Sequence, residues 1–395
     1  MTSEDKYILK RRISAAFLSF LFDCMSIFPI NKNKIVVSTF EGDGGYCCNP
    51  RYIVEELLKR DEKCQIIWLT HDTSKEFPKK IRVLKDTRLN TAYQLSTAKI
   101  WIDNYRKPLG TKKRKGQIYI QTWHASLGFK AVGLFRGKNF PKIGKIVSEA
   151  DSKLIDYILS NSDYCTSIFP KKLLYSGPVL QYGSPRCDCI INQKEALRKI
   201  VREELGISLS KKIVLYAPTF RGGNQKEKKE VTIDMPTIDF NQLLQSLQNK
   251  FEGDWIVLLR LHPQLSAKRY EIQFDAIKND AIDVSLYSDI SQLISASDAI
   301  VTDYSSCAFD ASFGMIPVFL YADDVNEYIR NRGQFMWKRE ELPFSIAEDN
   351  EQLADIIAGF DYSEYSNNIK GFMRKYGISE DGRASEKLVD FLLKL

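Results

Sequence analysis

The feature of this sequence that most constrains its fold is the alternation of short apolar runs with helical patterns along the chain. In the first half, one clear helical pattern covers 51–60, and runs of strand character lie at 34–40, 65–70, 80–85, 99–104, 117–123 and 156–162. A second series opens near residue 190 with a helical pattern at 195–205, followed by runs at 211–218, 255–262, 281–285, 299–304 and 316–322. Such alternation is typical of α/β folds with parallel sheets, so we predict two successive α/β halves.

The length of 395 residues fits two domains. We expect an N-terminal helix in 1–32, a first domain in 33–190, and a second in 191–395 that ends in a helix over 385–395. Parallel sheets bind ligands beyond the carboxyl ends of their strands, so two sheets that face each other would form a cleft. Neither half has the glycine pattern of a dinucleotide-binding or P-loop site after its first strand.

The N-terminus has two possible interpretations. Four cations, Lys6, Lys10, Arg11 and Arg12, precede an apolar segment over 13–30. This segment has no small-residue cleavage site, and Asp23 interrupts it, so it is a poor signal peptide and a marginal membrane span. It is either an amphipathic helix that lies on a membrane or a first helix packed on the protein.

The eight cysteines form no CxxC pair, which favours a reducing cytoplasm.

Charge is distributed unevenly. The formal net charge is +7, but the segment 104–148 alone holds eleven Lys or Arg and no acid. Phe, Leu and Ile alternate with these cations over 129–147. This pattern indicates contact with anionic lipid headgroups or another polyanion, and a solvated surface is the alternative. The cations that we assign to this membrane or acceptor surface are Lys130, Arg136, Lys138, Lys142 and Lys145.

Two of only three histidines lie at predicted strand ends. His124 follows 117–123, and His262 closes 255–262 just before Pro263. A single histidine at such a place is more often structural, but two at ligand-binding edges favour a chemical role. Histidine is the side chain best suited to accept a proton near neutral pH.

Three further elements of the second half predict phosphate binding. The run YAPTFRGG (216–223) brings Thr219, Arg221 and two glycines to a strand end. Arg260 lies two residues before His262, on the same face of the strand. Ser305 and Ser306 fall where a helix should begin, where hydroxyls cap and the helix dipole attracts anions. Asp303 either orients this turn or contacts a donor hydroxyl. Since no acidic metal cluster lies near these ends, we expect no metal and no cofactor.

In this order, the motifs resemble the CDP-glycerol glycerophosphotransferase family, which includes teichoic acid primases, polymerases and capsule-polymer relatives. The matching segments are QTWHASLGFK (121–130), GSPRCD (183–188), YAPTFR (216–221), RLHP (260–263), DISQLISASDAIVTDYSSCAFD (289–310) and RGQF (332–335). Short motifs in this one order are specific, although none would be alone. There are two departures, since Ala125 stands where the family has Gly, and Gln334 where it has Phe.

The resemblance implies a GT-B-like pair of Rossmann domains, with the acceptor bound by the first and the nucleotide donor by the second. The reaction it implies moves glycerol phosphate from CDP-glycerol to a hydroxyl of a lipid-linked or polymer acceptor and releases CMP. By the same resemblance, His124 is the base, His262 and Arg260 contact the donor pyrophosphate, and Thr219, Arg221, Ser305 and Ser306 are donor-site residues. The implied location is the cytoplasmic face of the membrane, with peripheral attachment.

Several alternatives stay open. The two departures leave ribitol or another polyol possible in place of glycerol. A nucleotide-sugar glycosyltransferase would share the fold, and a non-catalytic member could bind anionic polymer. Nucleic acid is the weakest option as a partner, because the basic segment contains no recognisable module. The acceptor, the distinction between primase and polymerase, and the oligomeric state do not follow from the sequence.

Overall fold

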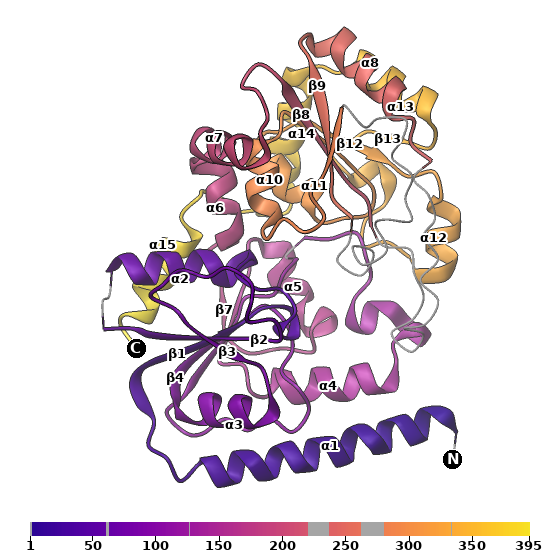
Figure 1. The fold of residues 1–395 in the computed structure, drawn as a ribbon. Coiled ribbons are helices and arrows are strands. Elements are labelled where there is room, and N and C mark those ends of the chain that lie inside the picture. The colour runs from indigo at the N-terminus through magenta and orange to yellow at the C-terminus, as the bar shows by residue number, and fades with distance from the viewer. Residues whose placement is uncertain (1, 61–62, 126, 220–236, 262–279, 333) are drawn as a thin grey trace. The chain divides into compact units, whose positions relative to one another are not determined.

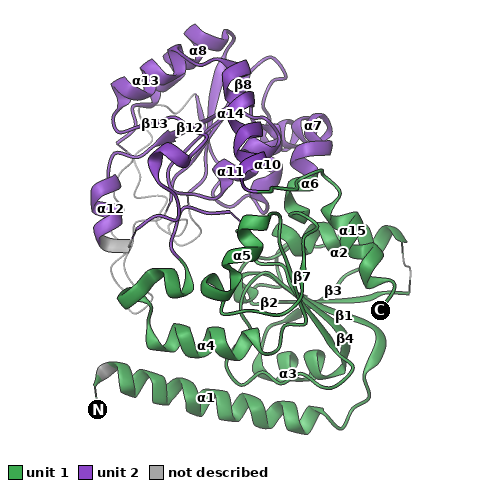
Figure 2. Cartoon of the chain, turned by 180° about the vertical axis from the view of Figure 1, so that it is seen from behind, with its two compact units in different colours: residues 1–126, 132–188, 377–395 green, residues 127–131, 189–376 purple. Residues whose placement is uncertain are grey.

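The computed structural model describes residues 2–60, 63–125, 127–219, 237–261, 280–332 and 334–395. These residues form two compact units (Figure 2). Unit 1 comprises 1–126, 132–188 and 377–395, and unit 2 comprises 127–131 and 189–376. Each unit is built on one parallel sheet, which confirms the prediction of two α/β halves.

Unit 1 contains a seven-stranded sheet in the order β3-β2-β1-β4-β5-β6-β7, with every pairing parallel. Its strands are β1 (Asn31–Ser38), β2 (Gln65–Thr70), β3 (Arg82–Lys85), β4 (Ala98–Asp103), β5 (Ile118–Gln121), β6 (Tyr157–Leu159) and β7 (Val179–Leu180). Its helices are α1 (Ser3–Met25), α2 (Cys48–Arg60), α3 (Arg88–Thr97), α4 (Lys142–Ser152), α5 (Asp163–Lys172) and α15 (Ala384–Leu392), with 3₁₀ turns η1 (Phe40–Gly42) and η2 (Gly133–Asn139) (Figure 1). Helix α6 (Pro185–Asn192) continues from unit 1 into unit 2.

Unit 2 contains a six-stranded parallel sheet in the order β10-β9-β8-β11-β12-β13. Its strands are β8 (Lys212–Ala217), β9 (Trp255–Leu259), β10 (Ala281–Asp283), β11 (Ala299–Thr302), β12 (Val318–Tyr321) and β13 (Ile346–Ala347). Its described helices are α7 (Lys194–Leu205), α8 (Phe240–Phe251), α10 (Ile290–Ala296), α11 (Cys307–Phe313), α12 (Val325–Arg332), α13 (Asn350–Ala358) and α14 (Tyr362–Lys375), with the 3₁₀ turn η5 (Arg339–Glu341).

Both sheets follow the strand order of the Rossmann fold. Numbered within its own unit, each sheet reads 3-2-1-4-5-6, and unit 1 adds a seventh strand. The order reverses between β1 and β4 in unit 1, and between β8 and β11 in unit 2. In open α/β sheets, ligands bind beside such a reversal at the carboxyl ends of the strands. The loops after these four strands are therefore the first places to look for a site.

Helix α1 packs on the protein along one face. This is the second of the two alternatives for the N-terminal segment. Leu18 and Phe22 belong to the same buried cluster as Val36 of β1 and Trp101 of β4. The loop around Gly110 lies so close to α1 that a Cβ at this glycine would come within 2.2 Å of a helix carbonyl oxygen. Among the described residues, no helix is both long enough and apolar enough to cross a bilayer.

The C-terminal segment differs from the predicted domain ranges. Leu388, Val389 and Leu392 of α15 lie in the core cluster of unit 1, with Ile35 and Val37 of β1. Residues 377–395 therefore belong to unit 1, whereas the sequence suggested one continuous second domain over 191–395. Asp188 helps to hold this segment, because its carboxylate accepts hydrogen bonds from the backbone N–H groups of Ala384 and Ser385 at 3.0 and 2.7 Å.

Candidate functional site

His124 lies at the carboxyl edge of the unit 1 sheet, three residues beyond the end of β5. Its half-buried imidazole lies among three aromatic rings, at centroid distances of 5.3 Å from Phe40, 5.6 Å from Tyr105 and 4.5 Å from Trp123. Phe40 follows β1 and Tyr105 follows β4, so the ring lies at the point where the strand order reverses. His124 thus lies at a strand end, as predicted, and at the edge where Rossmann-like units bind ligands.

The tautomer of His124 follows from one hydrogen bond. Nδ1 lies 2.8 Å from the backbone carbonyl oxygen of Asn104. A carbonyl can only accept, so Nδ1 carries the proton and Nε2 keeps its lone pair. Burial, together with the nearby charges of Arg186, Lys172 and Arg106, lowers the pKa of His124 to about 4. The imidazole is therefore neutral at pH 7, with Nε2 able to accept a proton.

The backbone that carries His124 is held in a rare conformation. Trp123 has φ of +51°, which is unfavourable for a bulky residue. Its N–H donates to Gln121 Oε1 at 2.9 Å, and its carbonyl accepts from Asn49 Nδ2 at 2.9 Å. Lys172 Nζ donates to the carbonyl of Ala125 at 3.0 Å. Strain of this kind persists only where surrounding contacts impose it, and it is typical of functional sites.

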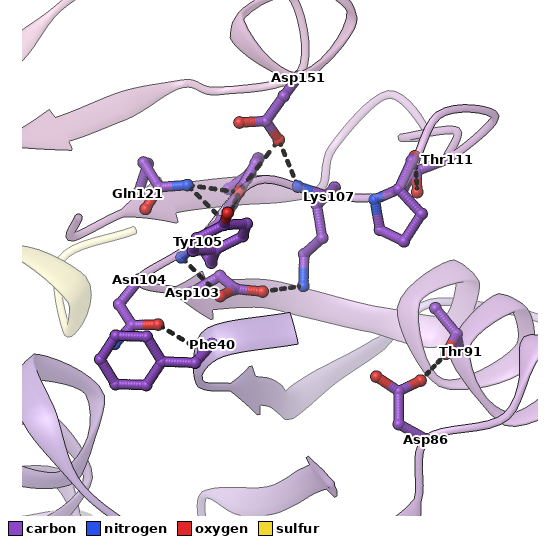
Figure 3. Close-up of polar contacts among 12 residues, drawn as sticks. Phe40, Asp86, Thr91, Asp103, Asn104, Tyr105, Lys107, Thr111, Gln121 and Asp151 are labelled. Carbon is purple, nitrogen blue, oxygen red and sulfur yellow. Dashed lines mark hydrogen bonds and ion pairs between the residues drawn. The ribbon is translucent and has the colours of Figure 1, made fainter. Parts of the chain in front are cut away.

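A buried polar network holds the segment 103–107, which contains the Asn104 carbonyl (Figure 3). Asp103 ends β4, and its carboxylate accepts from Lys107 Nζ at 2.6 Å and from the backbone N–H of Tyr105 at 2.9 Å. The N–H of Lys107 donates to Asp151 of α4 at 2.9 Å. Gln121 Nε2 donates to the carbonyl of Tyr105 at 2.9 Å. Burial raises the pKa of Asp151 to about 7. These contacts tie the segment 103–107, which includes Asn104, to β5 and α4.

In unit 2, Asp303 joins the two loops at the reversal of strand order. The N–H of Thr219, after β8, donates to both carboxylate oxygens of Asp303, after β11, at 2.9 and 2.8 Å. Asp303 thus fixes the loop after β8 against the loop after β11, and its predicted contact with a donor hydroxyl stays a prediction. The same hydrogen bonds bring Thr219 and Asp303, two predicted donor-site residues, into direct contact.

Arg260 and the serine pair are near this region but differ from expectation in detail. Arg260 Nη1 donates to the carbonyls of Tyr287 at 2.6 Å and Val284 at 3.3 Å, so part of its guanidinium supports the loop after β10. Ser306 occupies the N-cap position of α11 without a side-chain capping bond. The N–H of Cys307 reaches Ser305 Oγ at only 3.4 Å. The predicted hydroxyl capping is therefore wrong for Ser306 and marginal for Ser305.

The predicted membrane or acceptor cations divide between the units. Lys130 lies in the short segment 127–131 of unit 2, forms an antiparallel bridge with Phe335, and has Nζ 5.9 Å from the ring centre of Tyr328. The other four are in unit 1, where Arg136 and Lys138 lie on η2, and Lys142 and Lys145 on α4. Lys138, Lys142 and Lys145 are exposed.

Part of the basic segment is neutralised by acids outside it. Lys107 pairs with Asp103, Lys112 with Asp23 of α1, and Lys113 with Asp156. The predicted strip of eleven cations therefore includes structural ion pairs, while Lys138, Lys142 and Lys145 of η2 and α4 are among its exposed members.

Two predicted donor-site residues, Arg221 and His262, lie outside the described residues. In the part of the chain that is described, no group of three or more His, Cys, Asp or Glu is arranged to hold a metal ion.

Sequence reasoning missed Asn49, Asn104, Lys107 and Lys172, which hold the His124 loop. Only Asn104 carried a signal, since it follows the predicted strand 99–104 at the same sheet edge.

Comparison with known proteins agrees with this architecture. The family model for CDP-glycerol:poly(glycerophosphate) glycerophosphotransferase matches residues 20–394. A teichoic acid poly(glycerol phosphate) polymerase of Bacillus spizizenii is 29% identical over 99% of this chain and 100% of its own length. A teichoic acid glycerol-phosphate transferase of Staphylococcus aureus is 31% identical over 94% of this chain and 96% of its own.

The fold also matches a solved structure. The wall teichoic acid polymerase TagF superposes with a TM-score of 0.80 at 28% identity, over 99% of this chain and 95% of that one. Two further poly(glycerol phosphate) polymerases are longer. The chain spans 51% of the one from Staphylococcus epidermidis and 53% of the one from Bacillus subtilis.

Proposed function

Because the chain belongs to the CDP-glycerol:poly(glycerophosphate) glycerophosphotransferase family, we propose that it transfers glycerol phosphate from CDP-glycerol to a hydroxyl of a lipid-linked or polymer acceptor and releases CMP. The observation that carries this proposal beyond family membership is the state of His124. A neutral imidazole with its proton on Nδ1, placed at the ligand-binding edge of a Rossmann-like unit, is equipped to accept a proton at Nε2.

In the proposed reaction, the acceptor oxygen attacks the phosphorus that carries glycerol, in line with the departing CMP. Nε2 of His124 takes the hydroxyl proton as the new P–O bond forms, and the bond to the CMP oxygen breaks. The pKa of about 4 reflects burial and the electrostatic effect of three nearby cations. Anionic phosphates bound there would offset those cations, raise the pKa, and make Nε2 a stronger base when it is needed.

For the donor, we propose the loops after β8, β9 and β11 in unit 2. Thr219 and Asp303 fix the mutual position of two of these loops, and Arg260 supplies positive charge from the third. Ser305 and Ser306, whose hydroxyls are not used for strong capping, are free to bind phosphoryl oxygens. Arg221 and His262 complete this predicted donor set. Charge on the transferred phosphoryl group would be balanced by cations and hydroxyls.

The proposed place of action is the cytoplasmic membrane face, with peripheral attachment. The exposed residues Ile13, Phe17 and Phe20 form one stripe of α1, opposite its buried stripe. Leu134 and Phe135 are exposed on η2, close in sequence to Lys138, Lys142 and Lys145. Apolar side chains flanked by lysines suit the headgroup region of an anionic bilayer.

The test is to identify the released nucleotide. We expect the purified protein, given CDP-glycerol and a membrane-derived acceptor, to release CMP and form a phosphodiester. Parallel reactions with CDP-ribitol and with nucleotide sugars separate the alternatives. Faster CMP release from CDP-ribitol would change the donor, in agreement with the departures at Ala125 and Gln334. Release of a nucleoside diphosphate from a nucleotide sugar would replace the proposal with glycosyl transfer, and absence of donor binding would indicate a non-catalytic protein.

A further inference from the structure

The segment 103–107 carries the hydrogen-bond partner of His124. Its most important atom is the carbonyl oxygen of Asn104, which receives the proton of His124 Nδ1 at 2.8 Å. Residues 104–107 of this segment belong to no helix or strand. A carbonyl in an irregular loop has no neighbouring ladder to fix it, so other contacts must set the direction in which it points.

Those contacts converge on the two sides of Asn104. On its N-terminal side, the Asp103 carboxylate accepts from the N–H of Tyr105 at 2.9 Å and from Lys107 Nζ at 2.6 Å, so one carboxylate closes the whole turn (Figure 3). The side chain of Asn104 itself accepts from the N–H of Phe40 at 2.8 Å. The Asp103 carboxylate thus closes the turn through Tyr105 and Lys107, and the bond from Phe40 holds its middle.

The ion pair between Asp103 and Lys107 is unusually buried. The side chains of Asp103 and Lys107 are each only 4% exposed. Buried ion pairs cost desolvation, and well-packed apolar residues often serve stability as well or better. Other titratable groups face the pair: Asp151 accepts from the Lys107 N–H, and Glu41 and Tyr119 interact electrostatically with Asp103. The pair has a geometric use that an apolar replacement would lack, because its bonds define the curvature of the turn at Asn104.

We propose that the Asp103–Lys107 ion pair is a positioning device, which holds the Asn104 carbonyl against Nδ1 of His124 and thereby keeps Nε2 unprotonated and aimed at the substrate. The inference rests on the proposed role of His124 as the base. It adds two positioning residues, Asp103 and Lys107, which need not touch substrate.

The test replaces both charges together. Asp103→Asn combined with Lys107→Met leaves no unpaired buried charge, so the protein is expected to fold. We expect kcat to fall by about 10- to 100-fold, as displacement of a reacting group by about 1 Å does, with the KM for the donor unchanged. The matched control is Lys34→Met, which removes another buried lysine from the same sheet, far along β1 from the site, where Nζ donates to Thr97. It should leave kcat unchanged.

A second measurement reports on the tautomer directly. The chain has three histidines, so nitrogen-15 labelling of histidine yields three ring systems, and His124→Asn identifies the relevant one. We expect a proton on Nδ1 in the wild type and in Lys34→Met, and a proton shared with Nε2 in the double variant. A wild-type tautomer and kcat in the folded double variant would overturn the inference. Because the tautomer is read without turnover, failure of the base assignment, seen as an active His124→Asn, remains distinguishable.

Discussion

At the scale of single residues, the first consequence concerns the ring of His124. His124→Asn keeps a polar side chain of similar size but removes the basic Nε2. Since one general base contributes about 10²- to 10⁴-fold, we expect CMP release to slow by this factor. The control is His71→Asn, which alters an exposed histidine of the same unit, paired with Asp43. Equal loss in both variants, or full activity in His124→Asn, would contradict the assignment.

The second consequence concerns pH. The free base must be unprotonated, and burial lowers the pKa of His124 to about 4. As pH falls, kcat/KM should therefore decline with a midpoint near 4 rather than near the usual value of about 6.5. Bound phosphates should raise this pKa, so the midpoint for kcat should lie at higher pH than that for kcat/KM. Pre-incubation at each pH, followed by assay at pH 7, controls for unfolding. Coincident midpoints near 6.5 would show that the ring is not desolvated as described.

The residue scale also shows what sequence reasoning can reach. His124 was predictable because a histidine after an apolar strand is a local pattern. The partner of its Nδ1 is a backbone carbonyl twenty positions earlier, and Asn49, which holds the Trp123 carbonyl, is farther still. Such contacts depend on strand order, which no local spacing encodes. The turn at Trp123 was hidden for the same reason, because its positive φ is imposed by neighbours.

At the scale of elements, helix α1 has two apolar stripes with different uses. Ala15, Leu18 and Phe22 are buried, whereas Ile13, Phe17 and Phe20 are exposed. Changing the three exposed residues to Ser should leave the fold intact. Each aromatic or aliphatic side chain withdrawn from a bilayer costs about 1.5–3 kcal/mol, so vesicle binding should weaken by at least about tenfold. Sedimentation with lipid vesicles measures this, and unchanged binding would restrict α1 to its packing role.

The lysines of η2 and α4 predict a separable effect. Reversal of Lys138, Lys142 and Lys145 to Glu removes about 1 kcal/mol of attraction per lysine, which is on the order of 100-fold at low salt. The loss should occur only with anionic vesicles and should shrink as salt screens the charges. Neutral vesicles are the control. If the triple variant bound anionic vesicles as tightly as the wild type, these lysines would be ordinary solvated surface residues.

Helix α15 depends on a cap from a distant part of the chain. Arg383, at its N-cap position, makes no side-chain capping bond, and the Asp188 carboxylate accepts from the first two helical N–H groups instead. Asp188→Ala should destabilise the protein by about 1–3 kcal/mol, because two buried donors lose their partner. Asp188→Asn retains one acceptor and should cost less. Urea unfolding measures both, and equal stability of all three proteins would contradict the capping role.

At the scale of the whole molecule, the alternation of strands and helices predicted both sheets, because parallel strands are continuous apolar runs that stand out locally. It did not predict how the chain divides. Residues 127–131 belong to unit 2 although both flanking segments belong to unit 1, and 377–395 return to unit 1. Pattern and length assign neighbours in sequence to the same domain. A helix instead belongs to the unit whose core buries its apolar side chains. For α15, that core is formed by residues between 35 and 180, far earlier in the sequence.

The division of the chain into two units predicts which sheet a substitution in the C-terminal helix destabilises. Leu388 of α15 is fully buried in the core of unit 1, and Leu353 of α13 is buried in the core of unit 2. Each Leu→Ala change should cost about 2–5 kcal/mol through lost contacts and a cavity. Hydrogen exchange should then quicken by local unfolding of the affected unit. Leu388→Ala should expose β1 and β2, more than 300 residues earlier in the chain, while β8 and β11 stay protected. Leu353→Ala should produce the reverse. If Leu388→Ala instead loosened β8 and β11 first, the C-terminal helix would belong energetically to the second unit, as the sequence alone suggested.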